Sequence, residues 1–325
     1  MKFRKAKKED IPKMKKNTEK SPLVYIIVLN WNSYEDAIDC VNSCLKLTYS
    51  NFRILLMDNA STDGSESRLR EYFPDIEFIQ TGANLEYAKG NNLGICYALK
   101  KGAEFVWILN PDVKVEETSL SLLVDVFKKN PSLGICGPRI IQGDTKNRFY
   151  FDGLSIYPNK GYQYKFNTIE YWFTKTSPNL LDVDSVSGCS MLIRKSLLSD
   201  IGLIREDFLR YYNDVELSFR ARECGWQTAV CRKAIIMHRT NLRKINPHRL
   251  SIPPYPYVYR DSIFFAKIRK KFVLKAMLPL VVLGKIKTLF KEGYFMDSFK
   301  VLLTSLKIAL CVLLTPIKPI PRLET

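Results

Sequence analysis

Short apolar runs alternate with helix-like patterns through the first third of the chain. Three runs predict buried β-strands, at Leu23–Leu29, Phe52–Met57 and Phe105–Leu109. Between the first two, apolar residues recur at helical spacing over Tyr34–Leu47, after a plausible N-cap at Ser33. Strand–helix alternation of this kind is typical of a parallel sheet with right-handed crossovers. We therefore expect an α/β fold with a mostly parallel, Rossmann-like sheet flanked by helices.

The alternation stops after Pro138. Residues 142–180 are rich in Tyr, Phe, Asn and Lys without a clear period, and we expect an irregular insertion there. The pattern beyond it predicts a helix within Phe208–Trp226 and short strands at Val183–Val186, Met191–Ile193, Gln227–Cys231 and Ala234–Met237. The last of these strands leads directly to His238.

Two apolar stretches close the chain, Met277–Gly284 and Val301–Thr315. Each is shorter than the roughly 18 apolar residues of a membrane span. Lysines recur through both, which is typical of helices that lie in a membrane interface. The alternative is a helical subdomain packed on the core. We expect a basic disordered tail at 1–20, a catalytic domain at 21–250 and a C-terminal amphipathic helical, membrane-associating extension at 251–325.

The net charge of +17 lies at the two ends of the sequence. Residues 1–20 carry +6 and residues 260–325 carry +9, so the long middle is nearly neutral. Basic ends beside apolar segments favour an anionic membrane surface over nucleic acid. The eight cysteines form no CxxC pair, and the N-terminus has no apolar signal region. We expect a cytoplasmic protein, peripheral on the inner face of the cell membrane.

Asn and Asp cluster where the three strands end. Asn30 and Asn32 follow the first strand, Asp58 follows the second, and Asn110 and Asp112 follow the third. Ligands of open parallel sheets bind outside the carboxyl ends of the strands. The cluster therefore suggests a site for a ribose, a base edge or a metal bound to phosphate, although such residues are also common in turns.

Two carboxylates are the candidates for chemistry. Asp112 lies on a tight turn and suits Mg²⁺ or Mn²⁺, which share their coordination shell with substrate phosphates. The alternative is a type I turn with Pro111 at its second position. Asp214 begins a helix, where it is either a capping carboxylate or a general base that takes a proton from a sugar hydroxyl. Glu216 and Arg220 can pair along that helix.

Taken together, these segments resemble family 2 of the glycosyltransferases, which has the GT-A fold, and especially its bacterial rhamnosyltransferase-like members. The resembling segments span about residues 24–240 and agree in order and spacing. They are Val28–Asn32, Met57–Ser65, Asn84–Gly94, Leu109–Asp112, Gly188–Ile193 and Asp214–Trp226.

The resemblance implies roles for the strand-end residues. Asp58 would read the nucleotide base, with Asn30 and Asn32 close by, and Lys89 and Asn91 would lie near the ribose and diphosphate. Asp112 would be the surviving aspartate of a DxD metal motif whose first position is Asn110. His238 would be a second metal ligand, and Asp214 would be the catalytic base. The bound ion would be Mg²⁺ or Mn²⁺.

Three positions depart from the family pattern. Asn213 replaces the usual Glu before the base, Glu86 replaces a usual Gly, and Ile204-Arg205-Glu206 replaces Phe-Asp-Glu. The implied function is inverting, metal-dependent transfer of a sugar from dTDP-rhamnose or a UDP-hexose to a glycan or polyprenyl-linked acceptor in cell-surface polysaccharide synthesis. The alternatives are a sugar nucleotidyltransferase and an inactive relative that binds membrane or nucleic acid. The first strand lacks the Gly-rich basic loop that a nucleotidyltransferase would need.

Overall fold

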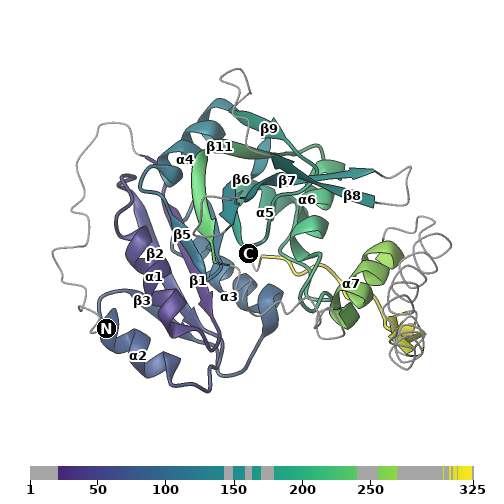
Figure 1. Cartoon of the computed structure of the whole chain (residues 1–325), viewed down its shortest axis with the longest axis horizontal. Helices are drawn as coiled ribbons and strands as arrows, with labels where there is room; N and C mark the ends of the chain where they lie inside the picture. The colour runs from purple at the N-terminus through teal and green to yellow at the C-terminus, as the bar shows by residue number, and fades with distance from the viewer. Residues whose placement is uncertain are drawn as a thin grey trace.

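A central sheet with helices on both faces organises the described part of the chain (Figure 1). The computed structural model describes residues 21–142, 149–157, 163–169, 179–239 and 255–268, and near the C-terminus residues 303, 307, 308, 310–312 and 314–323. The expected tail at 1–20 and the apolar stretch at 277–284 lie outside the described residues.

The strands and helices alternate as far as α4 and then lose that rhythm. The strands are β1 Val24–Asn30, β2 Phe52–Asp58, β3 Glu77–Gln80, β4 Phe105–Leu109, β5 Val113–Val115, β6 Leu133–Gln142, β7 Phe149–Tyr157, β8 Gln163–Ile169, β9 Leu180–Asp182, β10 Ser190–Arg194 and β11 Gln227–His238. The helices are α1 Tyr34–Cys44, α2 Ser65–Tyr72, α3 Glu86–Lys100, α4 Ser119–Lys129, α5 Lys195–Ile201, α6 Asn213–Glu223 and α7 Tyr255–Ile268.

The sheet is mixed, so the expectation of a mostly parallel sheet was wrong. Its main order is β3-β2-β1-β4-β10-β6-β11-β5. β3, β2, β1 and β4 are parallel, but β10 runs antiparallel to both β4 and β6. Helical crossovers connect the four parallel strands, whereas β10 follows β9 without a helix. Antiparallel neighbours need no long crossover, so the sheet changes direction where the helical connections end.

The expected irregular insertion is partly a β-hairpin. β7 pairs antiparallel with both β6 and β8. The expected strand at 183–186 forms only an isolated bridge at Ser185. The two short strands expected before His238 are one strand, β11, with an irregular register between Cys231 and Ile235.

Both faces of the sheet are buried, which explains the continuous apolar runs of β1, β2 and β4. In β1, Val24, Ile26 and Val28 pack toward α1, α2 and α4. Tyr25 and Ile27 point the other way, toward α3, α5 and α6. Alternate residues of β1 therefore contribute to two apolar cores, one on each face of the sheet. The last residue of the strand, Asn30, lies at the carboxyl edge of the sheet.

The described C-terminal residues pack beside the loop that precedes α6. Phe264 and Phe265 of α7 join Phe208 and Val215 in a third apolar cluster. The segment 316–323 then runs from beside α7 back to the central body, where Leu203 N–H donates to Pro321 C=O (Figure 1). The residue ranges of the expected domains stay a prediction. Among the described helices, none has the length and apolarity needed to cross a membrane.

Candidate functional site

The ends of β1 and β2 are joined by a buried polar network. Asn30 and Asp58 are register partners, and Asn30 Nδ2 donates to Asp58 Oδ1 at 2.9 Å. The Asp58 carboxylate also accepts from the Ser61 hydroxyl and N–H and from Gln80. Burial alone would raise the pKa of Asp58, but these hydrogen bonds outweigh it and lower the pKa. Asn30 Oδ1 remains a buried acceptor with no partner among the described residues.

Backbone strain marks the same edge of the sheet. The non-glycine residues with positive φ in the described ranges are Asn32, Ala60, Glu86 and Tyr212. Asn32 and Ala60 lie in the loops that follow β1 and β2, Glu86 is the first residue of α3, and Tyr212 directly precedes α6. Strained residues cluster where the surrounding structure holds a functional loop in place. Glu86 occupies the position where the family usually has glycine, and its φ of 57° explains that preference.

Asp112 and His238 form a pair at the β5–β11 edge. His238 is the register partner of Val113, the residue after Asp112. Their side chains approach to 3.2 Å between Asp112 Oδ1 and His238 Nε2. The Nε2 atom is buried, and the carboxylate is not aligned to hydrogen-bond with it. Arg239 continues the strand and donates its N–H to Asp112 C=O.

This pair fits a hard divalent cation. Two neighbouring ligands about 2.1 Å from an octahedral ion stand about 3 Å apart, close to the observed separation. Across the ranges that the structure describes, no cluster of three or more His, Cys, Asp or Glu side chains could hold a metal. A cation bound here would therefore depend on waters and substrate phosphates for the rest of its shell.

Asp214 lies in the first turn of α6 and faces Gly188. Gly188 N–H donates to Asp214 Oδ2 at 2.7 Å, and Val215 N–H donates to Oδ1 at 2.9 Å. Burial raises the pKa of Asp214, although these hydrogen bonds oppose the rise. The Tyr87 hydroxyl donates to Gly188 C=O at 2.7 Å. A Cβ at Gly188 would lie 3.1 Å from that hydroxyl and 3.3 Å from Asp214 Oδ2.

Residues Gly188 and Cys189 join the two candidate carboxylates. Gly188 holds Asp214, while Cys189 C=O accepts from Asn110 N–H, two residues before Asp112. Burial raises the pKa of the Cys189 thiol to about 12, and the charges of both Asp112 and Asp214 add to the rise. Carboxylates about a hundred positions apart in sequence therefore act on one thiol.

The other predicted site residues differ in how far they are buried. Asn91 is buried and donates to Tyr87 C=O, and its Oδ1 has no partner in the described ranges. Asn32 is exposed and accepts from Thr62 N–H. Lys89 is exposed on the outer side of α3, in a groove of about 510 Å³ between α3 and residues 203–206 and 322–323. Their proposed ligand contacts stay predictions.

The sequence left Tyr87, Gly188 and Cys189 without roles. All three belong to the segments that carry the family resemblance, which is the signal that could have selected them. Asn213, the first of the departures, is buried, and neither its amide oxygen nor its nitrogen has a partner among the described residues. Arg205, another departure, is buried and pairs with Asp207 and with Lys318 C=O.

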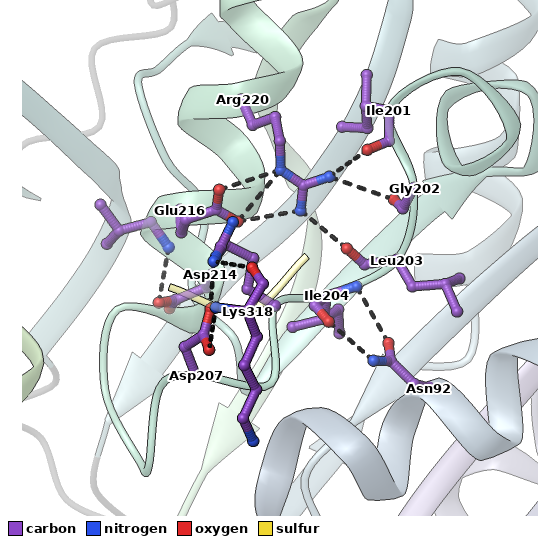
Figure 2. A network of polar contacts seen from close by, with 12 residues as sticks. Asn92, Ile201, Gly202, Leu203, Ile204, Asp207, Asp214, Glu216, Arg220 and Lys318 are labelled. Atoms are coloured by element: carbon purple, nitrogen blue, oxygen red, sulfur yellow. Dashed lines mark hydrogen bonds and ion pairs between the residues drawn. The ribbon is translucent and has the colours of Figure 1, made fainter. Parts of the chain in front are cut away.

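A buried polar network attaches α6 to the end of α5 and to the loop that follows it (Figure 2). Arg220 pairs with Glu216 at 3.0 Å and donates to the carbonyls of Ile201 and Leu203. Both side chains are buried. Asn92 binds both the N–H and the C=O of Ile204, which joins α3 to the same loop.

Several known proteins are similar to this chain in sequence. A "low-salt glycan biosynthesis hexosyltransferase" of Haloferax volcanii is 28% identical over 66% of this chain and 66% of its own length. An "N-acetylglucosaminyl-diphospho-decaprenol L-rhamnosyltransferase" of Mycobacterium tuberculosis is 28% identical over 57% of this chain and 66% of its own length. The chain thus matches these two relatives over slightly less than two thirds of their length. A "dTDP-rhamnosyl transferase" of Shigella flexneri is 23% identical over 80% of this chain and 82% of its own length.

Solved structures share the fold. GalNAc-T7, solved with UDP, GalNAc and Mn²⁺, covers 77% of this chain and 48% of its own with a TM-score of 0.61 and 14% identity. A mannosyltransferase from Pyrobaculum calidifontis, solved with GDP-Man and Mn²⁺, covers 92% of this chain and 76% of its own with a TM-score of 0.53 and 15% identity. The family model described as "Glycosyl transferase family 2" matches residues 25–202, more than half of the sequence. The chain belongs to glycosyl transferase family 2.

Proposed function

We propose that this protein transfers a sugar from a nucleotide-diphosphate donor to a saccharide or polyprenyl-linked acceptor, with inversion at the anomeric carbon and with the help of a divalent metal ion. The observation that carries the proposal is that two adjacent residues join the segments of the two carboxylates: Gly188 N–H donates to Asp214, and Cys189 C=O accepts from Asn110 N–H, two residues before Asp112. Asp112, paired with the His238 imidazole, supplies a negative charge for a metal ion, and the partly buried Asp214 supplies one that can accept a proton.

Asp214 is the general base of the proposed reaction. Each of its oxygens accepts one backbone N–H, and an ionised carboxylate offers about four lone-pair sites, so it retains capacity for a hydroxyl. The acceptor hydroxyl gives its proton to Asp214 as its oxygen bonds to the anomeric carbon. The bond from that carbon to the diphosphate oxygen breaks on the opposite face, and the nucleoside diphosphate leaves. A single displacement of this kind inverts the centre.

Asp112 and His238 would hold Mg²⁺ or Mn²⁺ in this proposal, with Asn110 close by in the chain. A bound divalent ion would stabilise the negative charge that develops on the departing diphosphate. Asn30, Asp58 and Asn91 bind the nucleoside portion. In this structure four protein donors occupy the Asp58 carboxylate, so Asn30 Oδ1 is the more available buried acceptor for a base N–H.

The donor and the acceptor follow from the relatives by analogy. One relative's name specifies a dTDP-rhamnosyl donor, and another's specifies a diphospho-decaprenol acceptor. We therefore propose dTDP-rhamnose or a UDP-hexose as the donor and cell-surface polysaccharide synthesis as the setting. A polyprenyl-linked acceptor places the protein at the cytoplasmic face of the membrane, in keeping with the basic, apolar C-terminal region.

The test is release of nucleoside diphosphate from a panel of donors, measured with and without an acceptor glycan. The expected result is acceptor-dependent release from one donor and a loss of turnover of about 10²–10⁴-fold in Asp214→Asn, with donor affinity retained. Near-normal turnover in that variant would refute the assignment of the base. Release of pyrophosphate from a nucleoside triphosphate in the presence of a sugar 1-phosphate, with no nucleoside diphosphate released from any donor, would favour a nucleotidyltransferase.

The metal assignment has a separate test. Asp112→Asn and His238→Gln should each weaken Mn²⁺ binding, measured by calorimetry or by electron paramagnetic resonance in the presence of UDP or dTDP. Loss of a group that only orients a metal ligand weakens metal affinity by about 10–100-fold, so loss of a ligand itself should cost at least about tenfold. Unchanged Mn²⁺ affinity in both variants would remove this pair from the metal site.

A further inference from the structure

We propose that Asp261, on a helix outside the region matched by the family, is a positioning residue for the catalytic base. The inference rests on the proposed role of Asp214. It concerns residues 207–211 of the loop that precedes α6 and their attachment to α7, which the sequence did not predict.

Asp261 binds three consecutive backbone N–H groups of that loop. Its Oδ2 accepts from Arg210 N–H at 3.0 Å and from Tyr211 N–H at 2.9 Å, and its Oδ1 accepts from Leu209 N–H at 3.3 Å. The carboxylate is completely buried. A buried charge is stable only when it is paired and hydrogen-bonded. Arg260 supplies the opposite charge at 2.6 Å, so the requirement is met.

Other contacts attach the same loop to the C-terminal residues. Arg260 donates to Asp207 C=O, and Lys318 N–H donates to Asp207 Oδ1 at 3.2 Å. Phe264 packs edge-on against Phe208 with ring centroids 5.4 Å apart. The loop is therefore held from two directions by residues far along the sequence. Figure 2 shows the side of this attachment that includes Asp207 and Lys318.

The pinned loop sets the start of α6. Tyr212 follows directly, adopts a φ of 64°, and accepts the first helical hydrogen bond from Glu216 N–H. Asp214 lies in that first turn. With residues 209–211 fixed by one carboxylate and Tyr212 in a left-handed conformation, little freedom remains in the backbone that carries the base. Leu209, Arg210 and Tyr211 are themselves exposed, so it is their backbone N–H groups that attach the loop.

The geometry predicts a loss of turnover without a loss of donor binding when the anchor is disturbed. In Asp261→Asn, an amide N–H₂ replaces one acceptor oxygen and faces backbone donors. A displacement of about 1 Å at a catalytic group can cost about 10²-fold in rate. We expect turnover to fall at least about tenfold, while affinity for UDP or dTDP with Mn²⁺ stays within about twofold.

The matched control is Lys267→Met on the same helix. Lys267 donates to the carbonyls of Val312 and Thr315, contacts of α7 that do not involve the loop. We expect turnover within about twofold of wild type in this variant. Hydrogen exchange supplies a readout that does not depend on activity. The amides of residues 209–211 should exchange faster in Asp261→Asn and remain protected in Lys267→Met.

Three results would overturn the inference: normal turnover in Asp261→Asn despite faster exchange at 209–211, an equal fall in nucleotide affinity and turnover, or an equal loss in Lys267→Met. If Asp261→Asn does not fold, Asp261→Glu carries the same test, because it keeps both acceptor oxygens but moves them by one methylene. A wild-type protein that transfers no sugar from any donor would instead overturn the proposed function, and this inference with it.

Discussion

At the scale of single residues, Asp214 is a carboxylate on whose pKa burial and hydrogen bonding act in opposite directions. It is held by two backbone N–H groups, which favour its ionised form, yet burial is the larger influence and raises its pKa. A general base works best when its pKa lies near the operating pH. The raised pKa of Asp214 therefore suits a general base better than a carboxylate that only caps the helix, because a capping carboxylate is stabilised in its ionised form and has a low pKa.

The pH dependence of turnover follows from that shift. Asp214 must be ionised to accept a proton, so kcat/KM should rise with pH through the raised pKa and level off above it. Because its pKa is higher in the folded state, Asp214 in its protonated form also stabilises the fold. This contribution is fully present below the unfolded pKa of about 3.9 and is lost as pH rises through the raised folded-state pKa. Kinetics over a pH series would check the first effect. The acidic limb should be absent from the residual activity of Asp214→Asn, and its persistence there would assign it to another group.

Glu86 is strained for a reason that the family pattern explains. Its φ of 57° is a conformation that glycine adopts at no steric cost. We expect Glu86→Gly to raise the free energy of unfolding by about 1 kcal/mol, measured by urea denaturation. Leu93→Gly, in the same helix, should act in the opposite direction by a similar amount because glycine destabilises helix interiors. A destabilised Glu86→Gly variant would mean that the Glu side chain makes a contact worth more than the strain.

Helix α6 illustrates the scale of the element. Sequence spacing predicted the Glu216–Arg220 pair, but only the fold buries it and adds the carbonyls of Ile201 and Leu203 as acceptors. The pair thus joins α6 to the end of α5 and holds the helix that carries Asp214.

Removing that link should destabilise the whole domain. Arg220→Met takes away the cation that Glu216 faces and leaves two carbonyl groups without their donor, at a cost of about 3–5 kcal/mol in the free energy of unfolding. Arg222→Met is the control on the same helix, because the Arg222 side chain is 32% exposed and pairs with Asp182 and Asp184, which are 68% and 30% exposed, and pairs this open to solvent contribute at most about 1 kcal/mol each. Urea unfolding of both variants measures the difference. Equal losses would contradict the structural role assigned to Arg220.

At the scale of the molecule, the described C-terminal residues have one side packed on α7 and another exposed to solvent. Ile308 and Val312 pack with the α7 cluster, whereas Leu310 and Leu314 are 61% and 76% exposed. The chain carries a net charge of +9 over residues 260–325. Exposed leucines beside lysines are typical of a surface that lies on an anionic membrane.

The double variant Leu310→Ser, Leu314→Ser should weaken binding to phosphatidylglycerol vesicles. Each buried leucine is worth about 1.5–3 kcal/mol, so losing two should lower the partition coefficient at least about tenfold. Co-sedimentation measures it, with Leu93→Ser as a control at an exposed leucine of α3. Unchanged sedimentation would exclude this surface as the membrane contact. Deletion of the C-terminal region is a poorer test, since it would also remove Asp261.

Local sequence pattern predicted the parallel half of the sheet well. The bounds of β4 agree fully with the expected strand, those of β2 differ by one residue at one end and those of β1 by one residue at each end, because strands buried on both faces are continuous apolar runs. Beyond Pro138 the pattern located β10 and β11, but it missed the β7–β8 hairpin and the antiparallel pairing of β10 with β4, a strand distant in sequence. No local periodicity encodes which strand is the neighbour.

The sequence by itself determined the polar residues at the strand ends, the candidate carboxylates and the family, because these depend on residue type and spacing along the chain. Only the tertiary structure decided that β11 brings His238 to Asp112, that Gly188 and Cys189 join the two carboxylates, and that Asp261 holds the loop before Asp214. Each of these contacts links residues separated by 26 to 126 positions. Their formation depends on the packing of the whole sheet and its helices, which no local segment of the sequence specifies.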